Sequence, residues 1–218
     1  MSDAFSAQRQ AWQGMIEQPL AFVADRCVRE CLPAELDDKH YRALRAAPRF
    51  EARLLQRLTG HFNLHTAALQ TPPQDEDLPV LLLSAEQFQR LPRLCGAIWH
   101  SATLSREIRS HVVNQLRGAL GNEVFAQALA HRSLAGAADL LRQPADLVQA
   151  IDRDGAACVL AWLQQQPAGL AAWLRLRLDV PLGEEAAATA TATFDPHIVR
   201  RAATTFNNVF STAAGESA

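Results

Sequence analysis

Hydrophobic residues recur at helical spacing through the middle of the chain. Between residues 101 and 120 they fall four positions apart, with charged and amide side chains filling the positions between them. The apolar members are Leu104, Ile108, Val112, Leu116 and Leu120. A single apolar stripe of this kind is typical of a helix that buries one face. The pattern predicts one continuous helix from Ser101 or Thr103 to Leu120.

A very short joint follows this helix. Gly121 suits the left-handed backbone that often ends a helix, and Asn122 is a favourable cap for the next one. The segment Glu123–Ala130 places Val124 and Phe125 on one side. Two antiparallel helices, a helical hairpin, are therefore expected here.

Helical patterns also account for most of the remaining chain. The predicted N-terminal helices are Phe5–Met15, Leu20–Cys31, Asp38–Ala46 and Arg49–His65. The stretch Gln70–Leu78 contains two prolines and three acidic residues and reads as a linker. We therefore expect an N-terminal helical region at 1–69 and a central and C-terminal helical body at 79–182. Within that body the apolar run 79–83 is an alternative strand, Pro144 begins a helix and Asp154 caps another.

The period changes from about 3.6 to 2 between residues 174 and 194. Leucines alternate with charged residues from Leu174, and threonines alternate with alanines in 183–195. This pattern favours a small β-hairpin near 174–194, although the Ala/Thr segment equally suits a flexible linker. An amphipathic helix at 196–211 ends the pattern. The fold class predicted is mostly α, a multi-helix globular fold.

Charge and composition exclude several kinds of partner. The chain has 218 residues, with 21 basic against 23 acidic side chains and a formal net charge of −2. No global positive field directs it to nucleic acid or anionic lipid. The N-terminus lacks a basic and then apolar leader, and no apolar run approaches the length that spans a bilayer. We expect a cytoplasmic protein without direct membrane insertion, whose four cysteines are reduced.

Candidate chemistry is sparse. No phosphate-binding glycine loop, nucleophile elbow or metalloprotease motif is present, so we expect neither an enzyme nor a bound cofactor. Cys27 and Cys31, with His61 and His65, have spacings that two helices could bring into a zinc site. The usual two-residue cysteine spacing is missing, and pairs four apart also arise wherever a helix buries one face. We expect buried thiols and no metal.

Positive charge gathers in one segment, here called the basic ladder. Its members are Lys39, Arg42, Arg45, Arg49, Arg53 and Arg57. Only Glu51 opposes them between residues 39 and 57. The ladder is either a solvated helix face or an electrostatic dock for an acidic partner. Nucleic acid is a weaker alternative for the ladder, which has one interleaved aromatic residue, Phe50.

The Leu120-Gly121 joint also suggests a helix-turn-helix. The helix after it, Glu123–Ala130, contains no basic residue and is poorly equipped to read DNA.

Several short segments between residues 60 and 182 form a signature in a fixed order. They are Leu94-Cys95-Gly96, Ile98-Trp99-His100, Ile108-Arg109, Leu116 with Leu120-Gly121, 155–163 (GAACVLAWL) and 173–178 (WLRLRL). This signature resembles that of the SctK (YscK/PscK) family of type III secretion injectisomes. This resemblance implies a mostly helical sorting-platform adaptor that links the cytoplasmic domain of the inner-membrane ring protein SctD to the pod protein SctQ and contacts other sorting-platform proteins. It also implies a peripheral location at the inner-membrane base of the apparatus, and a role in virulence.

An adaptor needs partner-binding surfaces, and several residues are candidates. They are Arg49, Arg53, Arg57, Arg106, Arg109, Arg200, Arg201, Phe206 and Phe210. The terminal helix that carries the last four either docks into a partner groove or packs on its own core. The alternative functions are a secretion chaperone or a regulatory protein-interaction module, and more remotely a helix-turn-helix regulator.

Overall fold

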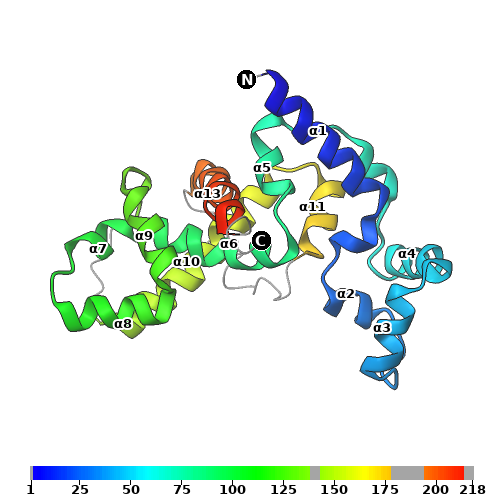
Figure 1. The fold of residues 1–218 in the computed structure, drawn as a ribbon, viewed down its shortest axis with the longest axis horizontal. Coiled ribbons are helices and arrows are strands. Elements are labelled where there is room, and N and C mark those ends of the chain that lie inside the picture. The colour runs from blue at the N-terminus through cyan, green and yellow to red at the C-terminus, as the bar shows by residue number, and fades with distance from the viewer. Residues whose placement is uncertain (1, 138–142, 178–193, 214–218) are drawn as a thin grey trace. The chain divides into compact units, whose positions relative to one another are not determined.

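The computed structural model describes residues 2–137, 143–177 and 194–213 (Figure 1). Within these ranges every regular element is an α-helix or a 3-10 helix, which confirms the mostly α class. The chain forms two compact units, each built from separate stretches of sequence. Unit 1 combines residues 1–85 with 166–181, and unit 2 combines 86–165 with 182–218. The expected linker Gln70–Leu78 lies inside unit 1 and is not the point where the units part.

Unit 1 consists of short helices. They are α1 (Ser2–Glu17), η1 (Pro19–Phe22), α2 (Asp25–Glu30), α3 (Asp38–Ala46), η2 (Pro48–Phe50), α4 (Glu51–His61), η3 (Thr66–Gln70), η4 (Asp75–Asp77), α5 (Leu78–Leu81) and α11 (Ala168–Arg175). The bounds of α3 agree with the prediction. The predicted Leu20–Cys31 helix is divided, because Val23 and Ala24 are extended. The apolar run 79–83 overlaps α5, so its first part is helical and does not form the strand that the sequence allowed.

The segment that begins with α11 is bonded into the core of unit 1. The buried Trp173 indole donates a hydrogen bond to the carbonyl of His65 at 3.1 Å. Arg177 is 2% exposed and donates to the carbonyls of Leu81, at 2.7 Å, and Leu83. Leu81 is the last residue of α5, and Leu83 lies just after it. A cation is favourable at the C-terminal end of a helix, where the carbonyl groups carry partial negative charge. Burial lowers the pKa of Arg177 to about 10, so the guanidinium stays charged at neutral pH.

The strand that the sequence predicted from Leu174 is not formed, because this residue belongs to α11. Residues 174–175 end α11, and Leu174, Leu176 and Arg177 are all buried, so the alternation does not mark two faces of a strand. Pro167 at the N-cap and the spacing of Leu170 and Leu174 fit a helix. The rest of the expected hairpin, 178–193, lies outside the described residues.

Unit 2 contains longer helices. They are α6 (Ala85–Trp99), α7 (Ser101–Arg106), α8 (Ser110–Leu120), α9 (Asn122–Ala130), η5 (Arg132–Leu134), α10 (Pro144–Gln164) and α13 (His197–Ala213). Helices α8 and α9 form the expected hairpin, joined at Gly121 with a φ of 90° that favours glycine. Asn122 is the first residue of α9 rather than its cap.

Helices α6 and α10 meet backbone to backbone through two glycines. A Cβ added at Gly96 would overlap the carbonyl oxygen of Ile151 and lie 3.0 Å from the amide nitrogen of Gly155. One added at Gly155 would overlap the carbonyl oxygen of Pro92 and lie 2.9 Å from the amide nitrogen of Gly96. Only glycine at both positions permits this approach.

A buried hydrogen bond between a histidine and a carboxylate accompanies the glycine contact. His100 Nε2 lies 2.7 Å from Asp154 Oδ2, and Arg153 Nε donates to Asp154 Oδ1 at 2.8 Å. His100 is 2% exposed and Asp154 6%. The expectation that Asp154 caps a helix is therefore wrong: it lies inside α10 and is hydrogen-bonded to His100, which follows α6, and to Arg153 of α10. Burial raises the pKa of Cys95 and of Cys158 far above that of an ordinary thiol, so both remain protonated.

The terminal helix α13 packs on α10 of the same unit. Ile198, Ala202 and Phe206 are at most 1% exposed, and Thr205 Oγ1 lies 3.0 Å from His131 Nε2. Of the two alternatives for this helix, core packing holds over the residues whose side chains are described. Phe206 is therefore corrected from an exposed contact to a core residue. The side chain of Phe210 lies outside the described part.

Gly96→Ala should destabilise the protein by about 2 kcal/mol or more, because the added methyl group forces two helix backbones apart. The matched control is Gly118→Ala in α8, where an added Cβ meets no atom within 4 Å. It should raise stability by roughly 0.4–1 kcal/mol through helix propensity and chain entropy. Urea unfolding followed by far-UV circular dichroism measures both. Equal midpoints for Gly96→Ala and the wild type would show that the close crossing is not required.

Candidate functional site

The basic ladder lies on unit 1, and the structure divides its arginines into two kinds. Arg45 on α3 donates to the carbonyl of Leu20 at 2.7 Å and lies 3.4 Å from a carboxylate oxygen of Asp25. Arg57 on α4 donates to the carbonyl of Cys31 at 3.4 Å. These two guanidinium groups connect segments within the unit.

The remaining arginines of the ladder point outward. Arg42, Arg49 and Arg53 are exposed, and the guanidinium of Arg49 lies 4.7 Å from the ring centroid of Phe50. Within the described ranges Arg42 and Arg53 make no side-chain hydrogen bond or ion pair. The four-residue spacing of Arg49 and Arg53 spans the junction of η2 and α4. Their charge is available to an acidic partner surface.

A second exposed feature is the turn between α7 and α8, where the predicted continuous helix is broken. The carboxylate of Glu107 accepts hydrogen bonds from Arg109: from its amide nitrogen at 2.8 Å, from Nε at 2.9 Å and from Nη2 at 2.7 Å. Glu107 and Arg109 are both extended. Local side-chain bonds to the backbone compete with helix formation, and a bidentate guanidinium–carboxylate pair is among the strongest.

This staple, formed by Glu107 and Arg109, holds Ile108 out of the core. Ile108 is 88% exposed and is the exposed large hydrophobic residue of the described part of the chain. Its neighbours in the predicted stripe, Leu104 and Val112, are buried on either side. The expectation that Ile108 belongs to the buried stripe is wrong, because the stripe assumed an unbroken helix.

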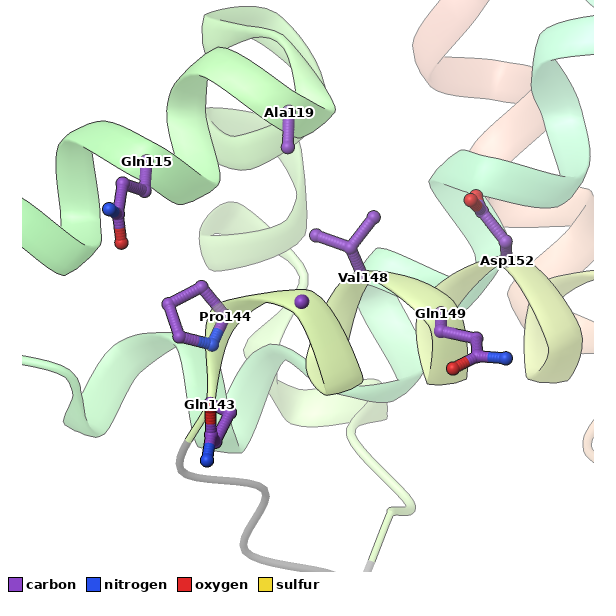
Figure 2. Close-up of a pocket in the computed structure, with 8 residues that line it drawn as sticks. Gln115, Ala119, Gln143, Pro144, Val148, Gln149 and Asp152 are labelled. Carbon is purple, nitrogen blue, oxygen red and sulfur yellow. The ribbon is translucent and has the colours of Figure 1, made fainter.

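An open hollow of about 650 Å³ lies between α8 and α10 in unit 2. In Figure 2, Val148 of α10 points into the space below Ala119 of α8. Pro144 and Ala145 add apolar surface, and the polar lining residues are Gln115, Gln143, Gln149 and Asp152. Arg93 holds Asp152 through two hydrogen bonds of 2.8 Å. Amides and one neutralised carboxylate supply no nucleophile or free base, so this hollow suits an apolar side chain rather than a reaction.

The residues considered for zinc are arranged differently from a metal site. Cys27 is buried, and the Sγ of Cys31 lies 3.2 Å from the carbonyl oxygen of Cys27. Burial is the main cause that raises the pKa of Cys31 to about 11. His61 is exposed and lies 3.7 Å from a carboxylate oxygen of Glu30, and His65 is exposed as well. Among the residues that the structure describes, no three His, Cys, Asp or Glu side chains are placed to hold a metal ion.

The other partner-binding candidates lie on unit 2. Arg106 is exposed in the last turn of α7, Arg201 is exposed on α13, and Arg200 is half-buried. The exposure of Ile108 was not predicted from the sequence, although Glu107 and Arg109 on either side of it were a signal of a local staple.

No helix in the described ranges is both long and apolar enough to cross a bilayer.

Half of the chain is similar to known proteins. Over 105 residues it is 33% identical to the nodulation protein NolU of Rhizobium fredii, and equally to that of Sinorhizobium fredii. The match covers 48% of this chain and 49% of each relative, so the chain spans about half the length of the curated relatives it matches. No protein-family model matches the chain, and no solved structure matches it.

The staple makes a prediction about pH. Hydrogen bonds from Arg109 lower the pKa of Glu107 to about 2 from a usual value near 4.5. A lowered pKa means that the staple is fully formed above pH 4.5 and is lost as the pH falls through about 2. Carboxyl NMR titration should place the Glu107 midpoint near 2, and Arg109→Ala should return it toward 4.5. A wild-type midpoint near 4.5 would contradict the staple.

Proposed function

We propose that this chain is a non-enzymatic structural adaptor of a type III secretion apparatus, linking the cytoplasmic domain of SctD to SctQ at the cytoplasmic base of the inner membrane. The observation that carries the proposal is the placement of two fixed, exposed features on two different units. The outward arginines of the basic ladder belong to unit 1, and the stapled Ile108 turn belongs to unit 2. A protein that joins two partners requires two such surfaces and no reaction centre.

The resemblance to the SctK family supports this proposal, because several residues that carry it make contacts on which the fold depends. Gly96 and Gly155 form the contact of α6 with α10, and His100 makes a buried hydrogen bond to Asp154 beside it. Trp173 and Arg177 bond α11 and the residues after it into unit 1. Residues that shape a fold in this way carry a family likeness without any catalytic motif. The similarity to proteins named for nodulation is consistent with a role in the association of bacteria with a host.

A secretion chaperone is the second candidate function. The apolar hollow between α8 and α10, with its rim of glutamine amides, favours it, because such a hollow accommodates a side chain of a bound peptide. A chaperone binds an exported protein, whereas an adaptor binds SctD and SctQ. Titration of the purified chain with each class of partner separates the two functions.

Charge reversal tests the contribution of the basic ladder to this adaptor. Arg49→Glu combined with Arg53→Glu should weaken binding to SctD or SctQ by roughly tenfold or more at low salt, because two attractive charges become repulsive. The effect should shrink as salt rises. Arg57 is left unchanged, because it bonds the carbonyl of Cys31. Isothermal titration calorimetry against each purified partner of the same bacterium measures the change.

The matched control reverses the same amount of charge elsewhere, with Arg132→Glu and Arg175→Glu, both at exposed positions. It should bind as the wild type does. Melting temperatures of all variants should stay within a few degrees, since surface charges contribute little to folding. Wild-type affinity of the Arg49/Arg53 variant for both partners at low salt would show that the ladder is only a solvated face.

A further inference from the structure

The Ile108 turn combines exposure with a fixed conformation. The apolar side chain is 88% exposed, whereas Leu104 and Val112 on either side are at most 4% exposed. Both ends of the turn are thus anchored in the core, and the Glu107–Arg109 staple closes the span between them. An isolated exposed hydrophobic residue is ordinary on a mobile surface. Here the residue is held outward, so a partner that buries it does not first have to order the turn.

Charge around Ile108 is asymmetric. The Glu107 side chain is 16% exposed, whereas the Arg109 side chain that binds it is 51% exposed. Arg106, three residues before Arg109, is exposed, and so is His111. The Glu107 side chain is thus less exposed than that of Arg109, and Arg106 adds a further exposed positive residue. A surface that complements this turn therefore presents carboxylates around an apolar pocket.

We propose that Ile108, flanked by Arg106 and Arg109, anchors a docking surface for an apolar pocket rimmed by carboxylates on a partner protein of the secretion apparatus. This inference rests on the proposed adaptor function and names one of its two binding surfaces. A branched aliphatic side chain entering a pocket, with arginines at the edge, has the composition of an interface hot spot.

A second copy of this chain fits the turn less well. The hollow between α8 and α10 would have to receive Ile108, and its one carboxylate, Asp152, is already bound by Arg93. Three glutamine amides make up the rest of its polar lining and bring no negative charge. A lipid surface is also a poor match, since one isoleucine and two arginines bury too little apolar area for stable membrane binding.

Substitution of Ile108 tests the proposal directly. Ile108→Ser should weaken binding to SctD or to SctQ at least tenfold in calorimetric titrations, while its urea midpoint stays at the wild-type value because the side chain is not part of the core. Ile108→Leu should retain affinity, because it still fills a pocket. Arg106→Glu should weaken binding to the same partner, most strongly at low salt. Gln13→Ser, at an exposed position of α1 away from both proposed surfaces in the sequence, is the control and should leave binding unchanged.

The contrary outcomes are distinct. If the wild type binds either partner and Ile108→Ser binds equally well, the docking surface is wrong and the adaptor function stands. If the wild type binds neither partner, the adaptor function and the docking surface fail together. Concentration-dependent dimers in light scattering that Ile108→Ser abolishes would assign the turn to a second copy and overturn the proposal.

Discussion

The contact between α6 and α10 at Gly96 and Gly155 is the constraint on which unit 2 depends. Two helix backbones approach so closely that any side chain at either glycine overlaps a carbonyl of the opposite helix. The His100–Asp154 hydrogen bond is buried beside this crossing and joins the residue that follows α6 to α10. A buried polar group that loses its hydrogen-bond partner costs free energy, so this bond favours the arrangement that keeps the two side chains together. Helix α13 then packs on α10 and completes the core.

Unit 1 depends on a different device, in which a late segment of the chain satisfies backbone groups of an early one. Arg177 donates to carbonyls at the end of α5, Trp173 donates to the carbonyl of His65, and the carbonyl of Leu176 accepts from the amide of Ala24 at 2.8 Å. Buried carbonyls without donors are costly, so these bonds hold the returning segment in place. Unit 2 thus relies on a close approach of two glycines, whereas unit 1 relies on buried side-chain and backbone hydrogen bonds.

The sequence predicted elements well where local signals agreed. Helix α3 has the predicted bounds because the Asp37 side chain accepts from the amide of His40 at its start, and the α8–α9 hairpin follows from Gly121. The predicted continuous helix was wrong because side-chain hydrogen bonds override the hydrophobic periodicity there. The Glu107–Arg109 staple interrupts a stripe that is otherwise regular. For the candidate surfaces, spacing located the basic ladder, but which arginines bind internal carbonyls depends on neighbours distant in sequence and emerges only from the fold.

The proposed adaptor function depends on the two exposed features, which the helix crossing of unit 2 and the returning segment of unit 1 support. In that proposal one copy of this chain holds two different proteins at once. Size-exclusion chromatography with multi-angle light scattering, applied to the purified chain mixed with the SctD cytoplasmic domain and SctQ, measures this directly. We expect a single peak whose mass requires all three proteins. Separate binary complexes that never combine, or no complex at all, would contradict it.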